Sequence, residues 1–448
     1  MAVPGEAVLT LTGAADADSV AAVPEGPLLW TFLAAIFLSQ VFLGPGVAVS
    51  DVLLGATAAG AALQAWRLKQ PPEWPRWATA LAFFWAWAVF GGLLHSLRTP
   101  FGFSHTEFAK SLAKLTFYGL SSVLMASRLK RVRPERLRET LLTLLAIHGA
   151  LAILIYLAML LWPELPYGRF LPGSSTGSYY FELRWFGDRS PESLVRQVFL
   201  RARGLSREPS HLGFVQAMGL GFVLLGGRAL PRFGARLALV LASILLTFSL
   251  TAYGLLGAVL LLASPRLFEG ATWRRRSVLW LALALGGTLL LPPVSRTLHR
   301  AVVVRGALLL QGKGDSSARL RLLESWTMAF RMARDSPMLG TGLGNFEQGL
   351  FAVMKDLPER ELLGPETQGW NVLAHVLAVT GGVGLVLFLL FLAQLVPGRA
   401  PSAALFLLGC IVQGSFLAAP FWVYWVVALR AGNGAASAGQ EESRLDGA

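Results

Sequence analysis

The residues best suited to chemistry form a short basic segment that leads directly into an apolar run. Residues 201–211 read Arg-Ala-Arg-Gly-Leu-Ser-Arg-Glu-Pro-Ser-His, and the apolar run begins at residue 212. Guanidinium groups bind phosphate oxygens in pairs and stay charged in a partly buried site. A second basic pair, Arg319 and Arg321, opens an amphipathic stretch later in the chain. Two such clusters beside apolar segments predict a polyanionic ligand at a membrane surface, and a lipid diphosphate fits best.

The composition indicates that these residues belong to a membrane protein. The chain has 448 residues, of which 54% are hydrophobic and 15% are charged, whereas soluble domains are about 25% charged. So much apolar surface cannot be buried in soluble modules. The high apolar content excludes a disordered chain, and Cys410, the single cysteine, excludes a disulfide framework. The net charge is +13. The arginines lie between apolar segments, so no nucleic-acid partner is expected.

The apolar runs predict an all-α, polytopic membrane protein of about 12 transmembrane helices. Two long runs, 237–264 and 403–429, each lie between basic clusters that should be cytoplasmic, so each should cross twice. We expect the first to be broken at 249–254 and the second around Gly414-Ser415. The runs suited to a single crossing are 28–45, 50–66, 77–95, 112–127, 139–162, 212–227, 277–294 and 370–395.

The arginine-rich segment 128–138 fixes the expected orientation, because clustered positive charge stays on the cytoplasmic side. Two long stretches then become periplasmic loops. No basic region directly precedes the first run, so no cleaved signal peptide is expected. The predicted order is a cytoplasmic segment (1–27), helices one to five (28–162), the first periplasmic loop (163–211), helices six to nine (212–294), the second, larger periplasmic loop (295–369), helices ten to twelve (370–430) and a disordered cytoplasmic tail (431–448).

The second loop should contain amphipathic helix. Apolar residues recur at roughly helical spacing over 322–333, and Asp315 or Ser316 is a suitable N-cap. This helix should end before Pro337, and a glycine-rich turn follows over 339–346. No strand precedes these glycines, so they do not indicate a dinucleotide-binding site.

Four elements occur in an order that resembles the O-antigen polymerase/ligase family. The members of this family are bacterial inner-membrane enzymes that move undecaprenyl-diphosphate-linked glycans. The resemblance implies a GT-C-like fold, a site facing the periplasm, and glycosyl transfer without a nucleotide sugar or cofactor. The elements are Arg203-Gly204 with Glu208-Pro209-Ser210, Ser249-Leu-Thr251-Ala-Tyr253-Gly254, Ser317-Ala-Arg319 continuing through Pro337 to Phe346, and Trp370-Asn371 continuing to Gly381-Gly-Val-Gly384.

The implied reaction is attack of an acceptor hydroxyl on the anomeric carbon, with inversion and departure of undecaprenyl diphosphate. Arg203 and Arg319 would neutralise the charge that develops on the diphosphate. Glu208 would serve as general base, although a helix-capping carboxylate explains it equally well. Further positions expected to bind the diphosphate or glycan are Arg207, His211, Arg321, Ser249, Thr251, Tyr253, Asn371 and His375.

Two positions depart from the family pattern. Trp370 stands where the family has a histidine, and Val379 stands where it has a glutamate. That histidine is thought functional in the ligases, and the Glu-Pro-Ser element is more typical of polymerases, so a polymerase is favoured. His375 lies five residues after Trp370, about 140° further round a helix, and is not an obvious substitute. No Asp-x-Asp motif occurs in the two loops, so a metal-independent enzyme is expected.

Two other functions stay open on the sequence alone. A ligase would transfer the glycan to lipid A-core, whereas the polymerase would extend another lipid-linked repeat. A non-enzymatic transporter of lipid-linked glycans is less favoured, because the spans carry few charges and the halves show no symmetry. In each case the expected partners are an undecaprenyl-diphosphate-linked oligosaccharide and membrane lipids.

Overall fold

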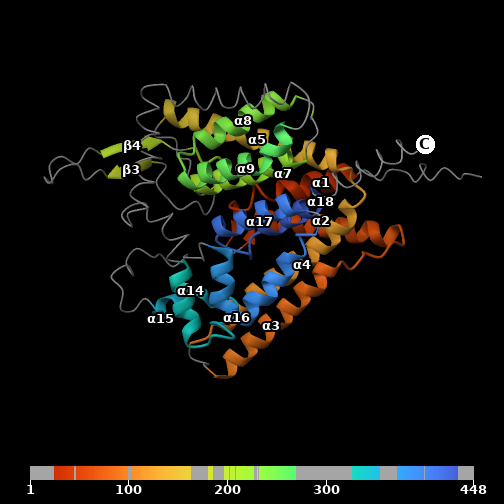
Figure 1. Ribbon diagram of the computed structural model, residues 1–448, viewed down its shortest axis with the longest axis vertical. Helices are drawn as coiled ribbons and strands as arrows, with labels where there is room; N and C mark the ends of the chain where they lie inside the picture. The colour runs from red at the N-terminus through yellow and green to blue at the C-terminus, as the bar shows by residue number, and fades with distance from the viewer. Residues whose placement is uncertain are drawn as a thin grey trace, which may run out of the picture.

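The protein is a bundle of helices that run between two ends (Figure 1). Three of the described helices are long and apolar enough to cross a membrane: Arg76–Arg98, Pro134–Leu161 and Val372–Ala393. Shorter apolar helices pack among them. The computed structural model describes residues 25–44, 47–98, 102–162, 180–184, 196–200, 202–206, 208–226, 230, 232–268, 325–353, 371–397 and 399–431.

The N-terminal third forms five helices. The first is shorter than the run 28–45 predicts, because it ends at Ala34 and the bonds Ile36 N–Leu33 O (3.2 Å) and Phe37 N–Ala34 O (3.1 Å) replace it with tight turns. A small hairpin follows, β1 (Phe42–Gly44) against β2 (Val47–Ala48). The helices are α1 (Glu25–Ala34), α2 (Val49–Arg67), α3 (Arg76–Arg98), α4 (His105–Leu129) and α5 (Pro134–Leu161).

The run 237–264 is divided into two helices, α8 (Phe233–Leu245) and α9 (Leu250–Phe268). The break spans residues 246–249, a few residues before the predicted bend, and Thr251 and Tyr253 already belong to α9. Phe248 takes a left-handed conformation here, with φ 44°. Helix α7 (Pro209–Leu225) packs along α9.

The C-terminal helices confirm the second predicted break. Helix α17 (Ala400–Val412) ends before Gly414 and α18 (Ala419–Ala431) begins after Ser415. Helix α16 (Val372–Ala393) is kinked at Gly381, whose φ is 69°. The amphipathic helix is observed as α14 (Ser325–Arg334), which ends before Pro337 as predicted, and a further short helix, α15 (Phe346–Val353), follows the glycine-rich turn.

The expectation of a purely helical chain missed two short antiparallel hairpins. Besides β1–β2, strands β3 (Tyr180–Arg184) and β4 (Arg196–Leu200) pair with Tyr180 opposite Leu200 and Arg184 opposite Arg196. Strand pairs this short depend on the turn and the register between them, which hydrophobic periodicity does not reveal.

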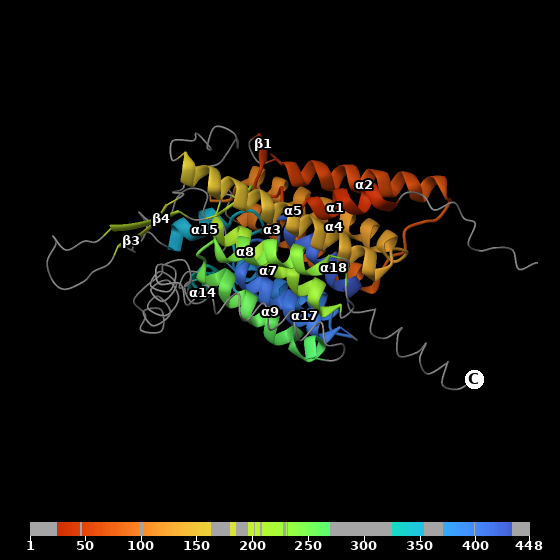
Figure 2. The same cartoon turned by 90° about the horizontal axis from the view of Figure 1, so that it is seen from above.

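Several basic side chains lie at one end of the bundle. At one end Lys130 on the α4–α5 connection pairs with Glu73, Arg430 donates to the carbonyls of Lys130 and Val132 (both 3.0 Å), and further round Arg236 lies 3.6 Å from Glu139. We call this the basic end. The hairpin end, at the left of Figures 1 and 2, carries β3–β4, α14 and α15. The contacts of Lys130, Arg236 and Arg430 thus bring three basic segments together at the basic end, and the side of the membrane that this end faces stays a prediction.

Candidate functional site

Arg203 lies in a tight turn that is built into the bundle at the hairpin end. Only 2% of its surface is exposed. The turn is closed by Ser206 N–Arg203 O (2.9 Å) and is tied to the end of α8 by Ala202 N–Leu246 O (2.8 Å). The α8–α9 break therefore supplies a backbone acceptor that a continuous helix would have used internally. The Leu246 carbonyl thus holds the segment that carries Arg203.

Gly204 lets this turn approach α5 closely. Its φ of 54° lies in the left-handed region, which favours glycine. A Cβ atom at this position would lie 3.0 Å from Ala152 Cβ and 3.4 Å from His148 Nε2. The Arg203 turn therefore rests on one face of α5, and a side chain at position 204 would push it away.

His148 lies beneath the turn and is oriented by Gln216 on α7. The Gln216 amide nitrogen donates to Leu145 O (3.1 Å) and lies 3.3 Å from His148 Nδ1. Because the Leu145 carbonyl accepts from the Gln216 amide nitrogen, this nitrogen is the end of the amide that faces α5. His148 Nδ1 therefore accepts a hydrogen bond from it, and the imidazole proton lies on Nε2. His148 is 4% exposed and its Nε2 has no hydrogen-bond partner. The ring also packs on Phe37, with centroids 4.9 Å apart.

His211 and Glu208 lie where α7 begins. Ser39, in the turn after α1, places its hydroxyl 3.2 Å from His211 Nε2. Glu208 occupies the N-cap position and is exposed, but its carboxylate makes no capping hydrogen bond. It accepts instead from Ser210 Oγ (2.9 Å). Glu208 therefore does not cap α7 through a side-chain hydrogen bond, although the positive end of the helix dipole still favours a negative charge at this position.

The hydroxyl groups at the α8–α9 break serve the backbone. Tyr253 donates to Leu245 O (2.6 Å), Ser249 accepts from Ala252 N (3.4 Å), and Thr247 donates to Ile244 O (2.6 Å). Broken helices inside a membrane protein need such substitutes for lost backbone bonds. Ser249 and Tyr253, predicted to bind ligand, thus stabilise the break, and Thr251 is half-buried beside them.

The glycine-rich turn folds onto α16 through backbone hydrogen bonds. Thr341 N donates to Ala378 O (2.9 Å), Gly342 N donates to Val379 O (3.0 Å), and Gly382 N donates to Pro337 O (2.7 Å). Val379, the position where the family has a glutamate, takes part through its carbonyl. Any residue can supply that group.

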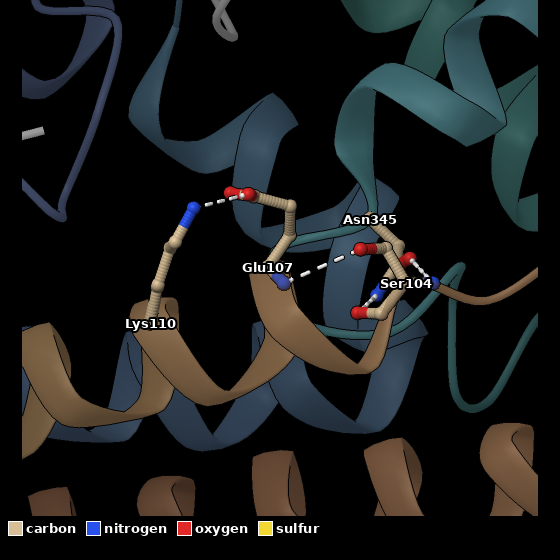
Figure 3. A network of polar contacts seen from close by, with 4 residues as sticks. All are labelled: Ser104, Glu107, Lys110 and Asn345. Atoms are coloured by element: carbon tan, nitrogen blue, oxygen red, sulfur yellow. Dashed lines mark hydrogen bonds and ion pairs between the residues drawn. The ribbon is translucent and has the colours of Figure 1, made fainter. Parts of the chain in front are cut away.

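Asn345 fastens the same turn to the start of α4. Its side chain accepts from Ser104 N (2.6 Å) and donates to Ser104 O (3.5 Å), as Figure 3 shows. Ser104 in turn caps α4 by accepting from Glu107 N (3.3 Å), and Glu107 pairs with Lys110 (2.7 Å). Two segments more than 200 residues apart are joined in this way.

Asn371 and His375 lie one turn apart at the start of α16. Asn371 caps the helix by accepting from Leu373 N (2.9 Å), and its amide nitrogen is buried without a partner. The His375 ring lies between Phe346 and Phe416, with centroid distances of 4.8 and 5.4 Å, and hydrogen-bonds to the backbone at Gly414. Its Nδ1 has no partner. Asn371 thus caps α16 and His375 packs between two aromatic rings. In each residue one buried nitrogen atom has no hydrogen-bond partner.

The predicted residues thus fall into two groups at the hairpin end. Arg203, Glu208, His211 and the α8–α9 break form one, and Asn371 with His375 forms the other. Arg207, Arg319, Arg321 and Trp370 lie outside the described residues. Among the described residues no three His, Cys, Asp or Glu side chains are grouped as a metal site requires, and metal independence stays a prediction.

Sequence reasoning missed Ser39 and Gln216, which contact His211 and His148. Ser39, His148 and Gln216 come from three different segments. A signal was present, because a histidine or glutamine inside an apolar helix is costly to bury and is usually functional or paired. The pairing itself could not be read from sequence, because 68 residues separate His148 from Gln216.

A known protein family matches a part of the chain that overlaps the candidate site. Residues 212–389 match the family model described as O-antigen ligase. No curated protein matches the chain. The matched segment includes the α8–α9 break, the glycine-rich turn and the start of α16, whereas Arg203, Glu208 and His211 lie just before it.

Proposed function

Because the chain belongs to the O-antigen polymerase/ligase family, we propose that it is a polysaccharide polymerase that uses lipid-diphosphate-linked glycans. The donor is an undecaprenyl-diphosphate-linked oligosaccharide, and the acceptor is the terminal sugar of another lipid-linked repeat. The reaction takes place at the periplasmic face of the bacterial inner membrane and needs no metal ion. The observation that carries this proposal is the buried Arg203, held in a turn by the α8–α9 break and by α5.

Arg203 has the properties that a diphosphate leaving group requires. The bond between the anomeric carbon and the diphosphate oxygen breaks while the acceptor oxygen bonds to that carbon from the opposite face. The negative charge on the departing diphosphate is stabilised by fixed guanidinium groups in a site with little water. Arg203 supplies one of them and Arg319 a second. A rigid turn serves this purpose because its cation needs no reorganisation as the charge develops.

Glu208 accepts the proton of the attacking hydroxyl. Its carboxylate is exposed at the mouth of α7, it lies beside the Arg203 turn in sequence, and Ser210 orients it through a 2.9 Å hydrogen bond. His211, held by Ser39, lies on the same turn of α7 and binds sugar hydroxyl groups. Asn371 contributes its unused amide donor to the glycan from α16.

A ligase is the second candidate, and one observation favours it. The matched family model is described by ligase activity. The ligase would use the same donor and the same Arg203 clamp, but would transfer the glycan to lipid A-core. Trp370 at the position of the family's histidine favours the polymerase.

Product analysis separates the candidates. Purified protein is mixed with synthetic undecaprenyl-diphosphate repeat units, with and without lipid A-core, in the presence of EDTA. The proposal predicts a ladder of longer lipid-linked products and release of undecaprenyl diphosphate. Transfer only when lipid A-core is supplied would identify a ligase. Absence of any new glycosidic bond, with donor crossing the bilayer of reconstituted vesicles, would identify a transporter.

A further inference from the structure

An open groove lies at the basic end, far from the Arg203 turn. It forms where the end of α2 meets α4 and encloses about 730 Å³. One wall is apolar and the rim carries two cations, so the groove is amphiphilic. Its lining residues are Ala62, Ala65, Trp66, Arg67, Lys69, Pro71, Pro72 and Leu124.

The two cations on the rim are not neutralised by the protein. Arg67 and Lys69 are exposed, and neither forms an ion pair with any other described residue. Glu73 is the one carboxylate in the linker between α2 and α3, and it is bound by Lys130 on the α4–α5 connection. That hydrogen bond and charge hold the pKa of Glu73 below its usual value. The groove therefore presents positive charge.

Lys69 also occupies a backbone position that favours glycine. Helix α2 ends in a Schellman motif, in which Gln70 N donates to Ala65 O (2.9 Å) and Lys69 N donates to Trp66 O (3.1 Å). Lys69 is the left-handed residue of this motif, with φ 50°. A lysine is strained where a glycine would be relaxed, and such strain is usually associated with function. The ammonium group is the feature that glycine would lack.

We propose that this groove binds an anionic phospholipid. The lipid phosphate lies between Arg67 and Lys69, and an acyl chain lies along the wall formed by Ala62, Ala65 and Leu124. Trp66 is 77% exposed and Trp74 is 60% exposed. Exposed indoles are typical of the level of lipid headgroups, which is where such a lipid would present its phosphate. Charge complementarity thus selects anionic over zwitterionic lipid.

Native mass spectrometry of the purified full chain tests this site. Protein in neutral detergent is titrated with phosphatidylglycerol or phosphatidylcholine, and the bound fraction is measured. A cation near a lipid surface contributes about 1 kcal/mol, so Arg67→Ala and Lys69→Gly should each weaken phosphatidylglycerol binding about fivefold. Ala62→Trp should block the groove without changing charge. Arg76→Ala, an exposed cation at the same end outside the groove, is the matched control and should bind normally.

The Lys69→Gly variant separates binding from folding. Because glycine relieves the left-handed strain, its thermal midpoint should be equal to or above that of the unchanged protein while lipid is lost. Equal retention of the two lipids would overturn the proposal, as would normal phosphatidylglycerol binding by the Arg67→Ala/Lys69→Gly double variant. Binding of inorganic phosphate at the same affinity as phosphatidylglycerol would show a simple anion site and would also overturn it.

Discussion

Arg203 and His148 at the hairpin end are both held by uncharged groups. Arg203 is fixed by backbone bonds and by the close approach of Gly204 to α5. His148 is fixed by Gln216, which is itself fixed by a backbone carbonyl. These backbone bonds fix the turn that carries Arg203. A charge that needs no reorganisation lowers a reaction barrier most, so the arrangement suits the proposed role of Arg203.

The His148–Gln216 pair should behave as one unit. Replacing Gln216 with Leu removes both of its hydrogen bonds and leaves a buried ring nitrogen unpaired, which should cost about 1–3 kcal/mol. Adding His148→Phe keeps the contact with Phe37 and removes the unpaired nitrogen. The thermal midpoint of the double variant in detergent should therefore lie above the value expected from adding the two single changes. Strict additivity would show that the two side chains do not interact.

Glu208 allows a test of the general base. Glu208→Gln keeps the size of the side chain and its acceptor for Ser210, but removes the proton-accepting carboxylate. The rate of glycan transfer should fall by about 10²–10⁴-fold. The thermal midpoint should change little, because no capping hydrogen bond is lost and an exposed charge at a helix N-terminus contributes at most about 1 kcal/mol. Ser210→Ala, which removes only the orienting hydroxyl, should have a much smaller effect. A lower midpoint with a normal rate would assign Glu208 to helix stability instead.

At the level of elements, the site depends on interrupted helices. The α8–α9 break ties down the Arg203 turn, and the kink in α16 receives the glycine-rich turn. A Cβ atom at Gly381 would lie 2.2 Å from the carbonyl of Met338, and its φ of 69° already disfavours other residues. The interruptions therefore hold two turns in place, the Arg203 turn and the glycine-rich turn.

Gly381→Ala should accordingly destabilise the protein. The left-handed conformation alone costs an alanine about 1–3 kcal/mol, and the clash with Met338 adds to this. The neighbouring glycine is a matched control, because a Cβ at Gly382 would meet Pro337 O at an acceptable 3.4 Å and its φ is not positive. We expect a clear drop in thermal midpoint for the first variant and a small one for the second. Equal midpoints would contradict the packing of the turn on α16.

Much of the helix order could be predicted from the sequence, and the reason is physical. Apolar runs of membrane length and arginine clusters are local signals. Both predicted breaks occur, and each is expected because the apolar run lies between two basic clusters. The β3–β4 hairpin and the early end of α1 depend on turns and register, which those signals do not carry.

The site could be predicted only in part. Arg203, Glu208 and His211 stand together in sequence, so a motif reveals them. His148 and Ser39 reach them through the fold. The hydroxyls of Ser249 and Tyr253 satisfy backbone groups at the break, and their contact with a ligand stays a prediction. A motif states which residues recur but does not distinguish a ligand contact from a structural one.

The whole molecule has one basic end and one end that carries the candidate site. If the basic end faces the cytoplasm, the hairpin end faces the periplasm. A membrane-impermeant maleimide should then label a cysteine at the hairpin end of the protein in intact cells whose outer membrane has been removed. Thr106→Cys and Gln70→Cys, both exposed, mark the hairpin and basic ends. Cys410 is buried and should contribute little background. We expect label at position 106 directly and at position 70 only after lysis. The reverse pattern would invert the topology.

The most direct test of the proposed reaction is the transfer rate after removal of the Arg203 charge. Purified Arg203→Ala in lipid nanodiscs, supplied with a synthetic undecaprenyl-diphosphate glycan, should lose about 10²–10³-fold in rate. Arg203→Lys should retain an intermediate rate, because it keeps the charge but loses the paired donors. Arg98→Ala, an exposed arginine at the end of α3, should transfer normally. Full activity of folded Arg203→Ala would contradict the diphosphate clamp.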